Sequence, residues 1–94
     1  MTYELEFDPR ALTEWSKLGD TVKNQFKKKL AGVLANPRVE SARLHNLPDC
    51  YKIKLKASGY RLVYQVQDSV ITVFVIAVGK REKSAAYHDA NKRL

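Results

Sequence analysis

Two short runs of alternating apolar and polar residues, 51–56 and 60–66, constrain the fold of this chain more than any other feature. The first run reads YKIKLK, the second reads YRLVYQV, and the letters ASG lie between them. Alternation with a period of two is typical of β-strands that bury one face. The two runs therefore predict a β-hairpin with a loop of about four residues, in which Ser58 and Gly59 form the turn.

The register of this hairpin follows from its apolar residues, because pairing Leu55 with Tyr60 or Leu62 places apolar side chains opposite one another. A slip by one residue would bury Arg61 and expose Leu62. Burial of Leu62 contributes roughly 1.5–3 kcal/mol, whereas burial of an unpaired guanidinium costs more than that. Both allowed registers therefore place Arg61 on an exposed face. The lysines of the first run share that face: Lys52, Lys54 and Lys56.

Like charges gathered on one sheet face raise the free energy of the sheet. A solvated strand face would account for any single lysine. Four neighbouring cations, followed along the chain by Lys80 and Arg81, instead favour a site for a polyanion. The chain carries a net charge of +7, which favours nucleic acid or an acidic protein segment as its partner.

The length of 94 residues predicts a single domain that spans residues 1–94. The longest apolar run, residues 70–78, is too short to span a bilayer, and acidic residues at positions 4, 6 and 8 argue against a signal peptide. The lone Cys50 excludes an intramolecular disulfide and suits the cytosol. We therefore expect a cytoplasmic protein that has no membrane partner.

The region before the hairpin predicts one strand and two helices. Residues 2–7 alternate like a strand, and Asp8 followed by Pro9 is typical of a helix start. We expect this short helix to end at Gly19. Its apolar stripe is Ala11, Leu12, Trp15 and Leu18. A second helix, capped at residue 20 or 21, has a stripe at helical spacing that consists of Val22, Phe26, Leu30, Val33 and Leu34.

Residues 70–78 are apolar on both faces, which predicts a central strand with cover on each side. A short final helix follows, with Ser84 as a possible cap and a weak stripe of Ala86, Ala90 and Leu94. Together these elements predict an α+β fold, with an antiparallel-rich sheet of about four strands. A helical hairpin from the N-terminal half would cover one face of this sheet.

Several kinds of site are not expected. The 4 glycines are isolated, so there is no glycine-rich phosphate loop. The acidic residues are dispersed, and His45 and His88 lie far apart in the sequence, so we expect neither a metal site nor a histidine-pair nuclease. No cofactor is expected.

Cleavage of RNA by its own 2′-hydroxyl remains chemically possible without these groups. The reaction needs a base that takes the proton of the hydroxyl. It also needs cationic groups beside the negatively charged phosphorane and the leaving oxygen. Lys54 is the best candidate for the base, because neighbouring cations would lower its pKa. Arg61 and Arg81 suit the phosphorane, since a guanidinium meets two oxygens at once. Tyr87 would stack on a base or hold the hydroxyl, or else face the core or a partner.

Several motifs spread over nearly the whole chain resemble those of the RelE toxins of bacterial toxin–antitoxin pairs. These are DCYKIKL at 49–55, GYRLVY at 59–64, VGKRE at 78–82, FD at 7–8, the 11–15 helix and KLG at 17–19. The resemblance implies a fold similar to that of microbial ribonucleases that use Glu and His instead. It also implies a ribosome-dependent endoribonuclease that enters the A site and cuts the messenger after the second nucleotide of the codon.

The same resemblance implies roles for particular residues. The implied catalytic set is Lys52, Lys54, Arg61, Arg81 and Tyr87, in which the lysines and the tyrosine serve the hydroxyl attack and the arginines serve the phosphate and the leaving group. The assignment of the individual acid and base stays open. Implied contacts to ribosomal and messenger RNA are Lys23, Lys27, Lys28, Arg43, His45, Lys56 and Lys80. His45 stands where family members carry arginine, which implies a weaker or pH-dependent contact.

The resemblance further implies a RelB-like antitoxin as a protein partner. We expect an amphipathic helix of that partner to displace the final helix at 84–94, because little apolar surface holds that helix to the sheet. Two alternative functions stay open: a gyrase-poisoning toxin of the related ParE type, and a non-catalytic RNA-binding module.

Overall fold

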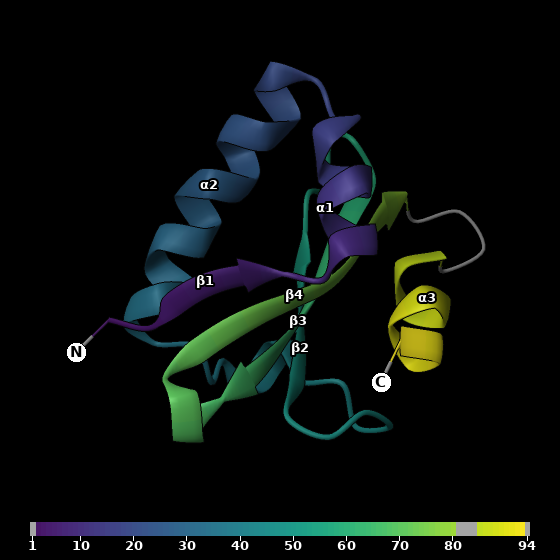
Figure 1. Ribbon diagram of the computed structural model, residues 1–94. Coiled ribbons are helices and arrows are strands. Elements are labelled where there is room, and N and C mark those ends of the chain that lie inside the picture. The colour runs from purple at the N-terminus through teal and green to yellow at the C-terminus, as the bar shows by residue number, and fades with distance from the viewer. Residues whose placement is uncertain (1, 81–84, 94) are drawn as a thin grey trace.

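A computed structural model describes residues 2–80 and 85–93 of the chain, with only the backbone described for residues 85–88. Its main elements are β1 (Glu4–Phe7), α1 (Pro9–Ser16), α2 (Asp20–Ala35), β2 (Cys50–Lys54), β3 (Tyr60–Gln67), β4 (Thr72–Lys80) and α3 (Ala85–Arg93). The strands form one sheet in the order β1-β4-β3-β2 (Figure 1). Only the β1–β4 pair is parallel. The predicted α+β fold with an antiparallel-rich sheet is confirmed.

The hairpin of β2 and β3 has one of the two expected registers. Lys54 lies opposite Arg61, and the Leu55 amide donates a hydrogen bond of 2.9 Å to the Tyr60 carbonyl. The loop is therefore residues 56–59. Gly59 has a φ of 76°, a left-handed conformation that glycine adopts without a steric cost. The Gly59 amide closes the turn by donating to the Leu55 carbonyl at 2.9 Å.

Helices cover both faces of the sheet, as the apolar run of β4 predicts. On one face Phe26, Leu30 and Val33 of α2 pack against β2, β3 and β4 side chains that include Ile53 and Tyr64. On the other face α3 supplies Ala90, which is fully buried. Ala90 packs with a second cluster that contains Leu47, Cys50, Val63, Ile76 and Ala77. Figure 1 shows α2 and α3 on opposite sides of the sheet.

The chain between α2 and β2 is held in place mainly by Arg38. Its guanidinium donates to the carboxylates of Asp68 at 2.7 Å and Asp49 at 3.2 Å, and to the Tyr51 hydroxyl at 3.1 Å. The Tyr3 hydroxyl donates to the same Asp68 carboxylate at 2.6 Å. These bonds tie the start of β1, the η2 turn (Asp68–Val70) and the entry to β2 together.

Three expected boundaries differ in the structure. Helix α1 ends at Ser16 instead of Gly19, and Leu12 is 51% exposed and outside the core. Gly19 is instead the N-cap of α2, in an extended conformation without a side-chain cap. Strand β4 begins at Thr72, because Val70 belongs to the η2 turn and Ile71 has a left-handed φ of 49°. Within the described residues, no helix has the length and apolar character needed to cross a membrane.

Candidate functional site

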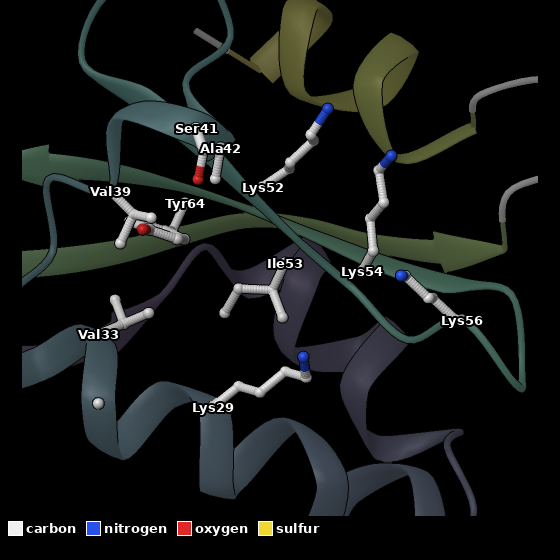
Figure 2. Close-up of a pocket in the computed structure, with 11 residues that line it drawn as sticks. Lys29, Val33, Val39, Ser41, Ala42, Lys52, Ile53, Lys54, Lys56 and Tyr64 are labelled. Atoms are coloured by element: carbon white, nitrogen blue, oxygen red, sulfur yellow. The ribbon is translucent and has the colours of Figure 1, made fainter.

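Three cations project from one face of the hairpin. Alternation along β2 places Lys52 and Lys54 on the same side, and the pairing of Lys54 with Arg61 brings the arginine to that side as well. This is the face on which α3 packs. In Figure 2 the side chains of Lys52 and Lys54 point toward α3. The predicted gathering is therefore present for Lys52, Lys54 and Arg61, although α3 partly covers the face. Lys56 was expected on the same strand face but belongs to the loop that follows β2.

The cations change the acid–base chemistry of Lys54. The pKa of its ammonium is lowered, first by the positive charge of Lys52, then by that of Arg61, with smaller effects from desolvation and Lys56. Each of these charges favours the neutral amine over the ammonium. A neutral amine accepts a proton, so the arrangement suits a general base at this position.

The cations open onto a small pocket at the turn of the hairpin. Its volume is about 300 Å³, and its lining consists of Lys54, Leu55, Lys56, Gly59, Tyr60 and Arg61. Three of these six residues carry positive charge. A pocket of this charge matches a phosphate group better than an apolar ligand.

A second and larger hollow, of about 720 Å³, runs between β2 and α2 (Figure 2). Ile53, Val33 and Tyr64 contribute apolar surface to it, and Lys29 borders it from α2. Lys52, Lys54 and Lys56 border it from the hairpin, although the side chains of Lys52 and Lys54 point toward α3. Sequence reasoning missed Lys29. The signal was present, because Lys29 lies three residues after Phe26 and four before Val33, at the border of the buried stripe.

The lysines of α2 lie on two sides of the helix. Lys28 and Lys29 line a hollow beside Lys54 and Lys56 of the hairpin. Lys27 instead borders an apolar groove on the β1 side of the sheet, formed by Leu5, Phe7, Trp15, Leu30, Ala31 and Leu34. Lys23 precedes Lys27 by four residues and so shares its side of the helix. The helical period divides the lysines between two sides.

Lys80 also lies apart from the cations of the hairpin. It pairs with Tyr60, one residue from the Arg61–Gly79 pair, so it points to the opposite face of the sheet from Arg61. Its ammonium lies 5.7 Å from the centre of the Tyr60 ring, within range of a cation–π contact. Lys80 therefore does not extend the cationic face of the hairpin.

The remaining predicted positions are scattered or lie beyond description. Arg43 forms an isolated bridge with Tyr51 at the outer edge of β2 and lies 3.7 Å from a Glu40 carboxylate oxygen. His45 is exposed in the following loop. Arg81 and Ser84 are outside the described residues, and only the place of Tyr87 within α3 is described. The described residues contain no group of three or more His, Cys, Asp or Glu side chains that could hold a metal ion.

The chain resembles known toxins along its whole length. Residues 5–85 match a family model described as the ParE toxin of the type II toxin–antitoxin system parDE. The mRNA interferase toxin RelE of Escherichia coli (strain K12) is 62% identical over 94 residues, covering 100% of this chain and 99% of that relative.

Solved structures agree with the sequence matches. A mutant of E. coli RelE in the free state matches with a TM-score of 0.93 at 61% identity, over 100% of this chain and 99% of that chain. The intact E. coli RelBE toxin–antitoxin complex matches with a TM-score of 0.82 at 64% identity, over 83% of this chain and 95% of that chain.

Proposed function

Because the chain belongs to the RelE/ParE family of toxins from type II toxin–antitoxin systems, we propose that it cuts messenger RNA in the A site of the translating ribosome. It is an mRNA interferase, an endoribonuclease whose activity inhibits translation. The observation that carries the proposal is Lys54, whose pKa is lowered by Lys52 and Arg61 on one face of the hairpin. The site of action we propose is the cytoplasm.

The reaction we propose is attack by the 2′-hydroxyl on the adjacent phosphodiester. Neutral Lys54 takes the proton of the hydroxyl, and the 2′-oxygen attacks phosphorus. Arg61 stabilises the dianionic phosphorane through two parallel hydrogen bonds. The bond between phosphorus and the 5′-oxygen then breaks, which leaves a 2′,3′-cyclic phosphate on one fragment. Arg81 supplies positive charge to the leaving 5′-oxygen, which takes a proton from water, and Tyr87 holds the hydroxyl or stacks on a base. These steps require no metal ion or cofactor.

Binding to the ribosome would use the cations that lie around the hairpin. Lys28, Lys29 and Lys56 line hollows that Lys54 also lines, which supports the proposal that they contact a phosphate backbone leading into the site. Outlying contacts to ribosomal RNA would come from Lys23, Lys27, Arg43, His45 and Lys80. Messenger RNA would meet the side with Lys52, Lys54 and Arg61.

A cleavage map tests the proposal. We expect cuts inside A-site codons when the protein acts on translating ribosomes, and almost none in the same RNA free in solution. The variant Lys54→Ala serves as the control for contaminating nucleases. Equal cutting of free and ribosome-bound RNA would contradict ribosome dependence, and binding without any cutting would favour an RNA-binding module.

A gyrase-poisoning toxin is the second candidate, because the matching family model is described for the ParE toxin. The cationic set on the hairpin favours the nuclease, since a protein that binds gyrase has no need of a lysine with a lowered pKa. A supercoiling assay with purified gyrase separates the two. We expect no inhibition at concentrations that stop translation.

The protein partner is an antitoxin of the RelB kind. A solved relative, E. coli RelE, is found in complex with RelB. For this chain we propose an acidic partner with an amphipathic helix, which would be attracted by the net charge of +7. We propose that this helix takes the place of α3 on the sheet.

A further inference from the structure

An ion pair joins the first helix of the chain to the last. The guanidinium of Arg93, in α3, donates to both carboxylate oxygens of Glu14, in α1, at 2.8 and 3.2 Å. The two side chains are mostly buried, with 11% of Arg93 and 26% of Glu14 exposed. Such a two-bond arginine–carboxylate pair is strong and fixes the relative orientation of its partners.

The same two side chains also bind the backbone of β4. Strand β1 pairs with β4 only as far as Val75, so in the described chain no strand follows along that edge beyond it. Glu14 accepts a hydrogen bond of 3.1 Å from the Val78 amide, and Arg93 donates one of 2.8 Å to the Ile76 carbonyl. Ile76 is the extra residue where the β3–β4 register shifts. The pair therefore satisfies backbone groups that a neighbouring strand would otherwise bind.

Helix α3 has few other contacts of comparable strength among its described side chains. Ala90 is fully buried in the second core cluster, but an alanine contributes little apolar area. Asp89 approaches Arg93 at 3.8 Å within the same helix and so does not connect α3 to the sheet. The apolar stripe is therefore not the sole attachment of this helix, because Arg93 adds a polar anchor.

We propose that Arg93 is a positioning residue whose pair with Glu14 holds α3 on the sheet beside Lys52 and Lys54. Both lysines point toward α3 (Figure 2), so loss of the anchor would change the surroundings of the proposed catalytic face. Without the guanidinium, the Glu14 carboxylate and the Ile76 carbonyl lose their charged donor, and breaking a buried pair on one side is strongly unfavourable. Undocking of α3 would return these two acceptors to water, so the variant favours the undocked position of α3. The inference rests on the proposed nuclease function only where it concerns cleavage.

The test compares Arg93→Gln with Arg93→Lys and with Lys92→Gln. Lys92 is exposed, adjacent in the same helix and equal in charge, so its variant controls for the loss of a cation. In the free protein, Arg93→Gln should speed amide exchange of α3 on the order of tenfold or more, while β3 and β4 change little. Arg93→Lys keeps one charged bond to Glu14 and should give an intermediate rate. Lys92→Gln should match the wild type.

Single-turnover cleavage on saturating ribosomes provides the second measurement. We expect Arg93→Gln to slow this step on the order of tenfold, without weakening ribosome binding, and Arg93→Lys to recover part of the rate. Unchanged α3 exchange, or equal acceleration in every element, would overturn the anchor. A looser α3 with a normal cleavage rate would overturn the positioning role. A wild-type protein that cuts nothing on ribosomes would refute the proposed function instead, and the exchange data would still decide the anchor.

Discussion

The charge of Lys52 increases the fraction of Lys54 that is a neutral amine, and it is the largest single cause of the lowered Lys54 pKa. Lys52 is itself half-buried and Lys54 is exposed, so proton uptake by Lys54 from solvent is not obstructed. A lysine at its ordinary pKa of about 10.4 is almost entirely protonated at neutral pH. The hairpin thus uses charge repulsion, which destabilises the sheet, to favour the neutral form of one amine.

Removing the charge of Lys52 should therefore move the pH dependence of cleavage upward. In Lys52→Gln the pKa of Lys54 rises toward its ordinary value, so less neutral amine is present at any pH below that value. Because the neutral fraction of an amine falls as its pKa rises, we expect a lower single-turnover rate at neutral pH. The rate should recover as pH increases. A pH profile that matches the wild type, with Lys92→Gln as the charge control, would contradict Lys54 as the base.

Arg61→Ala should lower the chemical step by roughly 10²–10³, by analogy with the loss of one donor to an oxyanion. Ribosome binding should change little, because many other cations remain around the hairpin. Single-turnover rates and ribosome affinity, measured together, separate the two effects. Lost affinity with a normal rate would show Arg61 to be a docking contact.

The sequence was sufficient to predict the positions of Lys52, Lys54 and Arg61, but not that of Lys80. Alternation in the hairpin separates a polar face from an apolar one, and so assigns every side chain to a face. The apolar run of β4 is buried on both sides, and it contains Ile76 as an extra residue opposite Val63 and Tyr64 of β3, so its pattern gives no face for Lys80. Arg93 was missed for a different reason, because its partner Glu14 lies 79 residues away in the sequence.

Helix α2 shows how the period of one element divides a set of equal charges. Lys28 and Lys29 lie beside the hairpin, whereas Lys27 lies on the β1 side, and Lys23 follows the side of Lys27. The apolar stripe in the sequence was enough to predict that α2 exists and that it is a helix. The ends of α1 and β4 did not, because Gly19 and Ile71 adopt conformations set by the packing of the elements that they join.

The two sides of α2 should differ in their effect on ribosome binding. The double variant Lys28→Gln/Lys29→Gln should bind with a weaker dependence on salt. We expect the negative slope of log affinity against log salt to become shallower by about 1.5, as for two lost phosphate contacts. The matched pair Lys23→Gln with Lys27→Gln removes the same charge and should change the slope less. Folding should survive in both, because the buried stripe of Phe26, Leu30 and Val33 is untouched. Equal slopes for the two pairs would show that the lysines act only through net charge.

At the scale of the whole molecule, the position of α3 affects both RNA cleavage and inhibition by the antitoxin, as we propose them. It covers the sheet face that carries the proposed catalytic lysines, and it occupies the surface that we propose the antitoxin helix takes. A partner that binds there must first break the contacts of α3, including those of Arg93 with Glu14 and Ile76. A partner helix can compensate for the lost contacts only if it buries more apolar area on the sheet than Ala90 does.

Amide hydrogen exchange of the wild-type protein, free and bound to its antitoxin, tests whether the partner helix replaces α3. We expect α3 amides to exchange faster in the complex, while β3 and β4 amides become more protected under the incoming helix. Cleavage should cease even though Lys52, Lys54 and Arg61 are unchanged, because α3 no longer lies beside them. Stronger protection of α3 in its original place would rule out displacement. In that case, inhibition by the acidic partner would act through the charge of the hairpin, and its affinity would fall steeply with added salt.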